Sequence, residues 1–575
     1  MIVLGIHHGH DSSAALIVDG KIIADVAEER FDRIKHSPNL PFRSIEYCLK
    51  AGGIKMEQVD IVALSSLEDD QELKLLFDGI YPVQVPENKN EGVKVILKKI
   101  LGKESEESTS LKTFKQREVP IYIKKFKISG KTKVVKVDHH QSHAASAYYT
   151  SGTRDKQLVV TMDGVGDGTS ISIWRGENGK LTCLKRFSHT ASLGWFYSNV
   201  TEGIGWIHGD GEGKTMGLDP YGKRGKIKGA LEKFHPKFKN GDITYAHDFG
   251  ELDIFSQSGY LQYHFRDAVE IQKLVEKYGR EDVAAEAQQV LEDECFNIIF
   301  PWLEKENTQN LSCSGGIFLN VKLNQRIWET GKVKLHNIYG NPGDAGLSVG
   351  AALQAYYNAN PTAPIYKMEH LFYGPEYTNE EIEPILKARN LKYKKVDDIE
   401  AYAAKLLSEN KIIAWFQGRM ESGPRALGNR SILMSANKSE NKDVINARVK
   451  FREAFRPFCP SLSWEKREDY LENCRDEFFM ITSFTCKAEK RSKIPAVVHA
   501  DNTLRPQTVK KEHNARYWNL LNEFGKITGE YLLMNTSFNV MGEPMINHPR
   551  EAIRCFYDNG IDHLILGNFV LSKEV

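Results

Sequence analysis

Apolar runs separated by short polar loops open the chain and recur after residue 157. The first segment, residues 2–29, predicts a strand, a His- and Ser-containing loop, a second strand, the turn Asp19-Gly20 and a third strand. Residues 158–187 repeat this order, with a Gly- and Asp-rich first loop. We therefore expect an internal duplication, in which the two first loops present backbone N–H groups to one nucleotide.

Helical periodicity dominates the part of the chain that follows the second copy. Apolar residues at 3.6 spacing predict core helix over about 268–304. The segment NLSCSGGIFLN then predicts a strand and a helix joined by Gly315 and Gly316, and a paired glycine lets a flat ring such as adenine lie against the backbone. Asp344 follows on a Gly-rich turn before a small-residue helix. Its carboxylate is compatible with a metal ligand and with a plain helix cap.

A Val-rich run ends at the segment DHHQSHAASAYY, residues 138–149, where a small-residue helix is predicted to begin. Asp138 is a suitable N-cap, and His139 and His143 then stand one turn apart on one helix face. That spacing lets two imidazoles bind one metal ion, but the other ligands must come from elsewhere. The alternative is a packed helix with two ordinary histidines.

Residues 358–370 have the Pro, Ala and Asn content of a linker, and the elements after them start a new module. We expect a helix over 379–389, a strand near 391–396, a second helix and the strand KIIAWFQG. The predicted domains are residues 1–360 and 371–575, joined by a linker over 361–370.

The candidate chemistry of the second module lies in three segments, two of which carry six cations between them. These segments are GRMESGPRALGNRS with Arg419, Arg425 and Arg430, VKFREAFRPF with Lys450, Arg452 and Arg456, and LLMNTSFNVMGEP with Ser537 and Asn539. Phenylalanines interleaved with the arginines indicate partly buried guanidinium groups, and a buried guanidinium needs an anion. The pattern favours a phosphate site over solvated surface charge.

Composition bounds the class of protein. A chain of 575 residues is expected to form roughly two to four domains. No run of about 18 apolar residues occurs, and the first residues lack the basic region of a signal peptide. Eight cysteines without a CxxC pair indicate reduced thiols. We expect a globular cytoplasmic protein without a membrane segment.

The near-zero net charge conceals two basic segments. Residues 87–136 hold 13 Lys and 1 Arg against 6 Glu, a net +8, and residues 223–239 hold 6 Lys and 1 Arg against 1 Glu, a net +6. Such segments are typical of solvated faces. A binding surface for a polyanion is the alternative.

Taken together, the ordered motifs resemble the nodulation- and tobramycin-type O-carbamoyltransferases over nearly the whole chain. The motifs in order are HHQSHAASAYY, MDGVGDG, SGGIFLN, GNPGDAG, GPRALGNRS, KFREAFRPF and NTSFN. The resemblance implies an α/β fold, with a duplicated actin/hexokinase-like domain followed by an α/β YrdC-like domain. The latter's Lys-x-Arg and Ser-x-Asn signature matches Lys450-x-Arg452 and Ser537-x-Asn539.

The resemblance also implies site residues at matching positions. The metal ligands are His139, His143, Asp163 and Asp344, with Fe(II) expected and Mn(II) or Zn(II) compatible with the same donors. Carbamoyl phosphate and ATP with Mg are expected on Arg419, Arg425, Lys450, Arg452, Arg456, Ser537 and Asn539, with Lys450 and Arg456 catalytic. The nucleotide-binding residues are Ser12, Gly164, Gly166, Gly315, Gly316 and Asn320. His10 lies beside the reacting carbonyl, either as general base or as a hydrogen-bond partner of the carbamoyl oxygen.

The implied activity is transfer of a carbamoyl group, through carbamoyl adenylate, to an acceptor hydroxyl. Most relatives act on small hydroxylated metabolites or sugars, which sets the expected acceptor class. A hydroxymethylated pyrimidine in DNA, bound through residues 87–136, is the alternative acceptor. An alternative function of a different class is a regulatory or chaperone-like ATPase of the same fold, but it leaves the cationic second module unexplained. Another alternative is a carbamoyl donor for a thiol or for tRNA, but no Cys spacing in this chain supports the zinc finger of the hydrogenase-maturation relatives. A homodimer is the expected assembly.

Overall fold

The computed structural model describes residues 1–65, 126, 128, 131–249, 252–257, 260–453 and 455–573. The protein is mixed α/β and divides into two compact units. The first unit comprises Met1–His7, Ala15–Ile22 and Leu49–Lys367, and the second comprises His8–Ala14, Ile23–Cys48 and Met368–Val575. The loop that contains His10 therefore groups with the C-terminal residues.

Two five-stranded sheets with the same strand order confirm the predicted duplication. The first sheet has the order β3-β2-β1-β4-β5 and the second the order β8-β7-β6-β13-β14. In each, a three-strand meander is followed by two strands that join in parallel, β4 and β5 or β13 and β14. Their bounds are β1 Ile2–His7, β2 Ser13–Val18, β3 Lys21–Ala27, β4 Ile61–Leu64, β5 Lys133–Lys136, β6 Gln157–Gly166, β7 Thr169–Glu177, β8 Lys180–Ser188, β13 Asn310–Ser314 and β14 Leu335–Ile338. This repeated order agrees with an actin/hexokinase-like domain.

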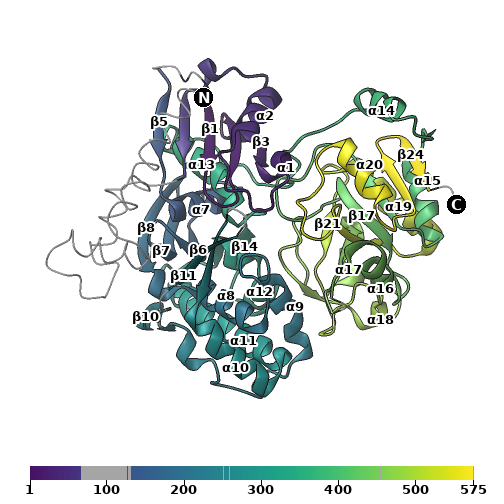
Figure 1. Cartoon of the computed structure of the whole chain (residues 1–575). Helices are drawn as coiled ribbons and strands as arrows, with labels where there is room; N and C mark the ends of the chain where they lie inside the picture. Colours follow the sequence, from purple (N-terminus) through teal and green to yellow (C-terminus); the bar gives the residue numbers. More distant parts are fainter. Residues whose placement is uncertain are drawn as a thin grey trace. The chain divides into compact units, whose positions relative to one another are not determined.

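Two helices of small residues, α7 (His139–Tyr148) and α13 (Leu347–Ala359), pack between these sheets (Figure 1). Helix α13 packs on β1 and β4, helix α7 packs on β6 and β13, and the two helices contact each other. Their approach is close, since a Cβ on Gly350 would lie 1.8 Å from the carbonyl oxygen of Ser142. The small side chains foreseen in both helices therefore set the distance between the two halves of the duplication.

The remaining elements of the first unit are mostly helical. They are α8 Leu193–Ile204, α9 Glu212–Leu218, β9 Lys237–Lys239, β10 Asp242–Tyr245, β11 Leu252–Gln257, β12 Tyr260–Phe265, α10 Arg266–Tyr278, α11 Arg280–Lys305 and α12 Val321–Glu329. The helical region predicted over 268–304 is confirmed, with a break at Gly279, where φ is +90°. Val283, Ala287 and Leu291 are buried, as their spacing indicates.

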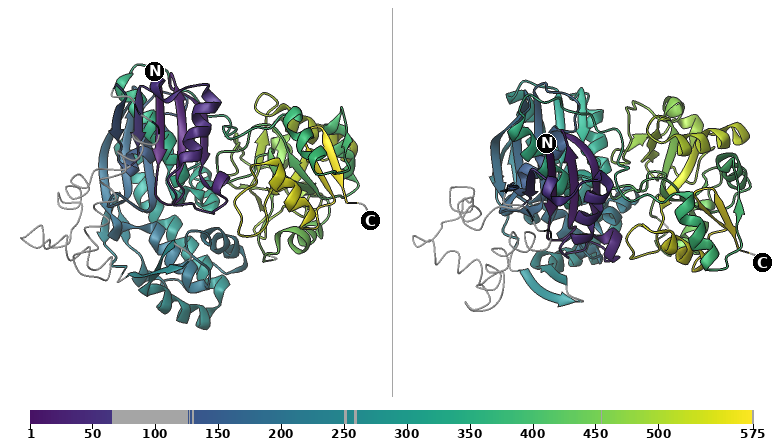
Figure 2. Two further views of the ribbon diagram at one scale, coloured as in Figure 1. Left: turned by 45° about the horizontal axis from the view of Figure 1, so that its top comes forward. Right: turned by 90° about the horizontal axis from the view of Figure 1, so that it is seen from above.

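An eight-stranded sheet with the order β15-β24-β23-β16-β17-β22-β18-β21 organises the second unit. Its C-terminal strands and helices are drawn from green to yellow in Figure 2. Its strands are β15 Lys394–Lys395, β16 Ile413–Phe416, β17 Arg430–Ser435, β18 Cys459–Ser463, β21 Gln507–Val509, β22 Leu532–Ser537, β23 His563–Leu566 and β24 Phe569–Ser572. Helices α15 (Ile399–Ser408) and α19 (Ala515–Thr528) pack together in a core that includes Trp415 and Phe524. The elements predicted between residues 379 and 416 all form, in the predicted order.

Shorter elements complete the second unit. They are α1 Glu29–Asp32, α2 Phe42–Gly52, most of which belongs here, α14 Asn379–Ala388, α16 Asn441–Ile445, α17 Arg467–Tyr470, α18 Ala488–Arg491, α20 Pro549–Tyr557 and the strands β19 Phe484–Thr485 and β20 Thr503–Leu504. A π-helix over Asn446–Lys450 follows α16. π-turns inside helices occur frequently at functional sites, and this one ends at Lys450 of the Lys-x-Arg motif.

A buried carboxyl group lies on β3, within the second unit. Asp25 is 1% exposed, and its backbone N–H lies 3.4 Å from the carbonyl of Tyr373. Burial raises the pKa of Asp25 to about 7, and the hydroxyl of Ser422 opposes this rise. The protonated form is therefore the one that the fold prefers.

This raised pKa predicts a pH-dependent stability. A carboxyl whose pKa is higher in the folded state stabilises the fold below its unfolded pKa, and this contribution is lost as the pH rises toward about 7. Asp25→Asn should therefore gain about 3 kcal/mol relative to the wild type between about pH 5 and about pH 8. Urea denaturation at both pH values measures the difference. The matched control is Asp397→Asn, at an exposed position. An equal difference at both pH values would contradict the prediction.

The structure bears on the expectations about membrane helices, cysteines and the two basic segments. Among the described residues, no helix is both long and apolar enough to cross a bilayer. All cysteines are free thiols, and six are buried, whereas Cys183 is exposed and Cys474 intermediate.

Most of the basic segment 87–136 lies outside the described residues. In the segment 223–239, four cations form ion pairs, namely Arg224 with Asp219 and Glu292, Lys226 with Asp282, Lys233 with Glu270 and Lys237 with Glu232. This second segment therefore has the features of a solvated face with paired cations.

Candidate metal and anion sites

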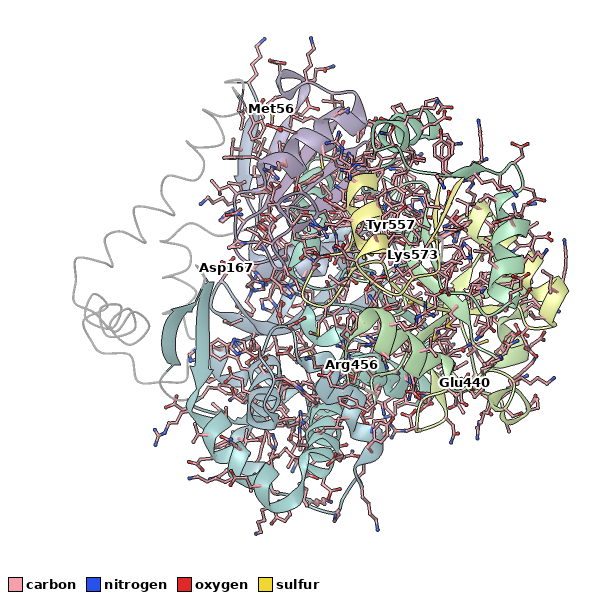
Figure 3. The ribbon with its side chains drawn as sticks, turned by 45° about the vertical axis from the view of Figure 1, so that its right-hand side comes forward. Met56, Asp167, Glu440, Arg456, Tyr557 and Lys573 are labelled. Atoms are coloured by element: carbon pink, nitrogen blue, oxygen red, sulfur yellow. The ribbon has the colours of Figure 1, made fainter. Side chains whose placement is uncertain are left out.

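Helix α7 begins at the predicted N-cap, which is itself held in place. One carboxylate oxygen of Asp138 accepts the backbone N–H of Gln141 at 2.7 Å. Both oxygens accept the guanidinium of Arg186, at 2.8 and 3.0 Å. Asp167, labelled in Figure 3, accepts the backbone N–H of His139 at 2.8 Å. The start of the helix is therefore fixed by two carboxylates, which complement its positive end.

His139 and His143 face the same two carboxylates, Asp163 near the end of β6 and Asp344 on the turn before α13. Nε2 of His143 lies 2.9 Å from Asp163 Oδ2 and 3.5 Å from Asp344 Oδ1. Nε2 of His139 lies 3.5 Å and 3.7 Å from the same atoms. All four donor atoms lie within 4.8 Å of one another. The packing of α7 between β6 and α13 thus brings together residues that are 205 positions apart in sequence at most (139 to 344).

Neighbouring groups orient these side chains. Nδ1 of His143 lies 3.3 Å from the hydroxyl of Ser314, which in turn lies 3.3 Å from the carbonyl of Pro342. His140 points elsewhere and bonds Thr161 and the carbonyl of Thr169. A Cβ on Gly166 would lie 2.2 Å from the His139 ring, so only glycine allows this approach. If Nδ1–H of His143 is donated to Ser314 when a metal ion is bound, the Nε2 lone pair would be available to that ion, whereas without an ion Nε2–H donates to Asp163.

The site has the electrostatics of a cation-binding pocket. Burial lowers the pKa of His139, but Asp344 and Asp163 outweigh it and raise the pKa to about 9. Burial would raise the pKa of Asp163, but hydrogen bonds with His139 and His143 hold it well below its usual value. Two carboxylates and two imidazoles are a donor set suited to Fe(II), Mn(II) or Zn(II). The residues therefore fit a divalent metal ion.

The loops predicted to bind a nucleotide adopt compact turns beside this quartet. Gly316 approaches the Asp163 carboxylate, since a Cβ there would lie 2.9 Å from Oδ1, and Gly164 donates its N–H to the same oxygen at 2.7 Å. Gly315 has φ of +105°. Asn320 caps α12 by accepting the N–H of Leu323, which is a structural role. Ser12, in the second unit, is fully buried, and its N–H donates to the carbonyl of Ser37.

A cluster of cations forms in the second unit, hereafter the cationic cluster: Arg425, Lys450, Arg452, Arg456 and Arg505. Repulsion from Arg505, followed by burial, lowers the pKa of Arg425 to about 9. Burial and then Arg456 lower the pKa of Arg452 to about 9 as well. The carboxylate of Glu453 lies 3.9 Å from Arg456, labelled in Figure 3. A bound anion would relieve this repulsion, so the cationic cluster is a candidate anion site.

Lys450 joins the Lys-x-Arg and Ser-x-Asn motifs as their spacing in the family implies. Its Nζ donates to the carbonyls of Ser537 and Asn539, at 2.5 and 3.0 Å, and to Asn539 Oδ1 at 2.8 Å. Lys450 is 6% exposed, and burial followed by repulsion from Arg452 holds its pKa well below the usual value. The structure thus places Lys450, Ser537 and Asn539 together.

Two arginines of the segment GRMESGPRALGNRS bond main-chain carbonyl groups. The guanidinium of Arg419 donates to the carbonyls of Ile23, Tyr373 and Gly374. Arg430 is fully buried, donates to four carbonyls and stacks 3.7 Å from the ring centre of Phe416. Arg419 was expected to bind phosphate, and in this structure its guanidinium bonds the main chain.

His10 lies on a loop of the second unit with its side chain 69% exposed. Its Nδ1 lies 2.9 Å from a carboxylate oxygen of Asp11. The side chain of the neighbouring Asp11 is much less exposed to solvent, at 20%. An exposed imidazole whose Nδ1 lies beside a carboxylate is compatible with either role expected for His10.

Sequence reasoning missed several residues of these sites. Arg505 donates two hydrogen bonds to the thiol sulfur of Cys459, and it lies outside the three segments identified from sequence. Glu421 accepts the backbone N–H groups of Leu427, Asn429 and Arg430, and so folds the loop that contains Arg425. Glu421 lies within GRMESGPRALGNRS, where a lone acid among arginines was the available signal. Arg505 offered none, since a single Arg before Pro is common.

Known proteins are similar to this chain over most of its length. The family model described as Carbamoyltransferase N-terminus matches residues 2–353, and the one described as Carbamoyltransferase C-terminus matches residues 404–573. Nodulation protein NolNO of Sinorhizobium fredii is 32% identical, over 98% of this chain and 79% of that protein. The uncharacterized protein sll1178 of Synechocystis is 34% identical, over 99% of this chain and 96% of that protein. Nodulation protein U of Sinorhizobium fredii is 27% identical, over 100% of this chain and 99% of that protein.

Proposed function

The chain belongs to the carbamoyltransferase family of the nodulation-protein type, and from that membership we propose that it forms carbamoyl adenylate from carbamoyl phosphate and ATP and transfers the carbamoyl group to an acceptor hydroxyl. The observation that supports this most directly is the pairing of two sites of different chemistry. One is the quartet of His139, His143, Asp163 and Asp344, and the other is the cationic cluster.

The cationic cluster suits the adenylation step. Carbamoyl phosphate gives carbamate and phosphate with water, a carbamate oxygen then bonds the α-phosphorus of ATP, and the bond to pyrophosphate breaks. The phosphate groups of both substrates are polyanions, and their binding would relieve the repulsion among Arg425, Arg452 and Arg456. Lys450, held by Ser537 and Asn539, would fix the position of the transferred charge. ATP with Mg is the expected form of the nucleotide.

The metal quartet suits the transfer step. His139, His143, Asp163 and Asp344 would hold the ion, with Fe(II) as our proposal and Mn(II) or Zn(II) compatible. When bound, such an ion supplies Lewis acidity toward the carbamoyl adenylate. The turns at Gly164, Gly166, Gly315 and Gly316, which pack closely against the quartet and its neighbours, would lie beside the adenylate. His10 would take the proton of the acceptor hydroxyl as its oxygen bonds the carbamoyl carbon and AMP leaves.

For the acceptor we propose a small hydroxylated metabolite or sugar. Four cations of residues 223–239 form ion pairs, three of them with acids outside the segment, which reduces the cationic surface that it offers to a nucleic acid. DNA with hydroxymethylated pyrimidines stays as the second candidate through the segment 87–136. The family membership favours carbamoyl transfer over a regulatory ATPase. A cytoplasmic homodimer is also part of the proposal.

The test is incubation with carbamoyl phosphate, ATP, Mg and Fe(II) against monosaccharides, aminoglycosides and hydroxymethylcytosine DNA. We expect pyrophosphate release that depends on carbamoyl phosphate, and the mass of one added carbamoyl group on one acceptor class. His10→Ala should retain pyrophosphate release and lose transfer by about 100-fold or more. ATP turnover that is independent of carbamoyl phosphate would reject the proposal, and loss of pyrophosphate release in His10→Ala would remove His10 from the transfer step.

A further inference from the structure

A row of three side chains stands behind the exposed ring of His10. Asp11 Oδ2 lies 2.9 Å from Nδ1 of His10, and Asp11 Oδ1 lies 2.8 Å from Nδ1 of His36. The backbone N–H of His36 donates to Glu29 Oε2 at 3.0 Å. Ser12 donates its N–H to the carbonyl of Ser37 at 3.1 Å, so the two loops are also joined by their main chains. All of these residues belong to the second unit.

The protonation state of Asp11 decides the direction of these bonds. Burial would raise the pKa of Asp11, but the hydrogen bonds to His10 and His36 outweigh it and hold the pKa far below its usual value. At neutral pH Asp11 is therefore a carboxylate, which only accepts hydrogen bonds. Both imidazoles consequently donate through Nδ1–H. In the neutral form of His10 the lone pair is then on Nε2.

The backbone shows that the turn itself does not require a carboxylate. Asp11 has φ of +62° and His36 has φ of +54°, both in the left-handed region. Glycine adopts this region without cost and asparagine adopts it readily, so either residue would serve the turn as well as aspartate. The charge of Asp11 is thus separable from its backbone role, and substitution by asparagine isolates that charge.

We propose that Asp11 is a positioning residue that fixes His10 as the Nδ1-protonated tautomer, with its Nε2 lone pair ready to take the acceptor proton, and that His36 positions Asp11 from behind. The inference rests on the proposed role of His10 as general base. In the step concerned, the acceptor oxygen bonds the carbamoyl carbon, the bond to AMP breaks, and the hydroxyl proton moves to Nε2 of His10. Asp11 stays ionised and stabilises the imidazolium that forms.

The experiment uses the full chain labelled with ¹⁵N-histidine, with His10→Ala to assign the His10 signals. In the wild type the neutral His10 ring should show protonation at Nδ1. In Asp11→Asn it should shift toward Nε2 protonation, the form that predominates in an unconstrained imidazole. His36→Gln should keep the Nδ1 form, because the amide can donate to Asp11, whereas His36→Ala should lose part of it. The matched control is Asp19→Asn, since Asp19 also has positive φ (+49°) but pairs with the N-terminal amine.

Kinetics supply the second readout. For the acceptor of the panel that the wild type carbamoylates, Asp11→Asn should lower kcat for transfer by about 10-fold or more, with KM for that acceptor and pyrophosphate release unchanged. An unaltered His10 tautomer in Asp11→Asn would overturn the proposal, and so would an altered tautomer with wild-type kcat. If the wild type carbamoylates no acceptor, the proposed function fails instead, and the NMR result still decides whether Asp11 sets the tautomer.

Discussion

Replacement of Lys450 by methionine is expected to lower carbamoyl-phosphate-dependent pyrophosphate release by about 100-fold or more. The Lys450 ammonium is buried, joins Ser537 to Asn539 and lies within the repulsive field of Arg452. Methionine retains the length and most of the volume of the side chain but removes the charge and its donors. The substrate anions would then lose the group that links both motifs of the site.

A ligand-induced change in thermal stability tests the same site without catalysis. Inorganic pyrophosphate should raise the Tm of the wild type, because an anion relieves the repulsion within the cationic cluster. The rise should be smaller in Lys450→Met and in Arg456→Gln, a second variant at a partly exposed position that is less costly to the fold. Lys526→Met, at an exposed lysine of α19, is the matched control and should respond as the wild type does. Equal Tm shifts in all four proteins would contradict an anion site at this cluster.

Replacement of His143 by alanine should remove the bound metal and lower transfer by about 100-fold or more, while pyrophosphate release continues. The imidazole is 1% exposed and lies nearest to Asp163, so its loss opens the quartet at its tightest contact. A hundredfold loss corresponds to about 3 kcal/mol of transition-state stabilisation, within the range expected of a metal ion that acts as a Lewis acid.

Metal content measured by plasma mass spectrometry provides the readout for this variant. The wild type should hold one equivalent after loading with Fe(II), and His143→Ala should hold much less. His140→Gln is the matched control, because His140 lies on the same helix and is equally buried but bonds Thr161 and Thr169. This control should retain the metal even if it is less stable. Retention of one equivalent by His143→Ala, or loss by both variants, would refute the assignment of His143 as a ligand.

Local sequence was sufficient to predict the features that depend on residues close together in the chain. The duplicated strand order and the N-cap at Asp138 depend on residues close in sequence, where periodicity, capping and turn preferences act. The glycine at position 166 was also visible as part of a loop. The sequence did not show that Gly166 makes room for the His139 ring, because the helix that approaches this loop is known only from the structure.

Tertiary structure alone showed which of the cations and acids lie close to one another and which bond the main chain. Arg419 and Arg430 share a motif with Arg425, yet their guanidinium groups bond carbonyl oxygens, whereas Arg425 interacts electrostatically with Arg505, which is 80 positions away in sequence. The sequence by itself determined the strands, the helices and the candidate ligands. Only the packing of α7 between β6 and α13 brought His139, His143, Asp163 and Asp344 within 4.8 Å of one another. The physical reason is that hydrogen bonding and electrostatics depend on distance in space, and burial determines their strength.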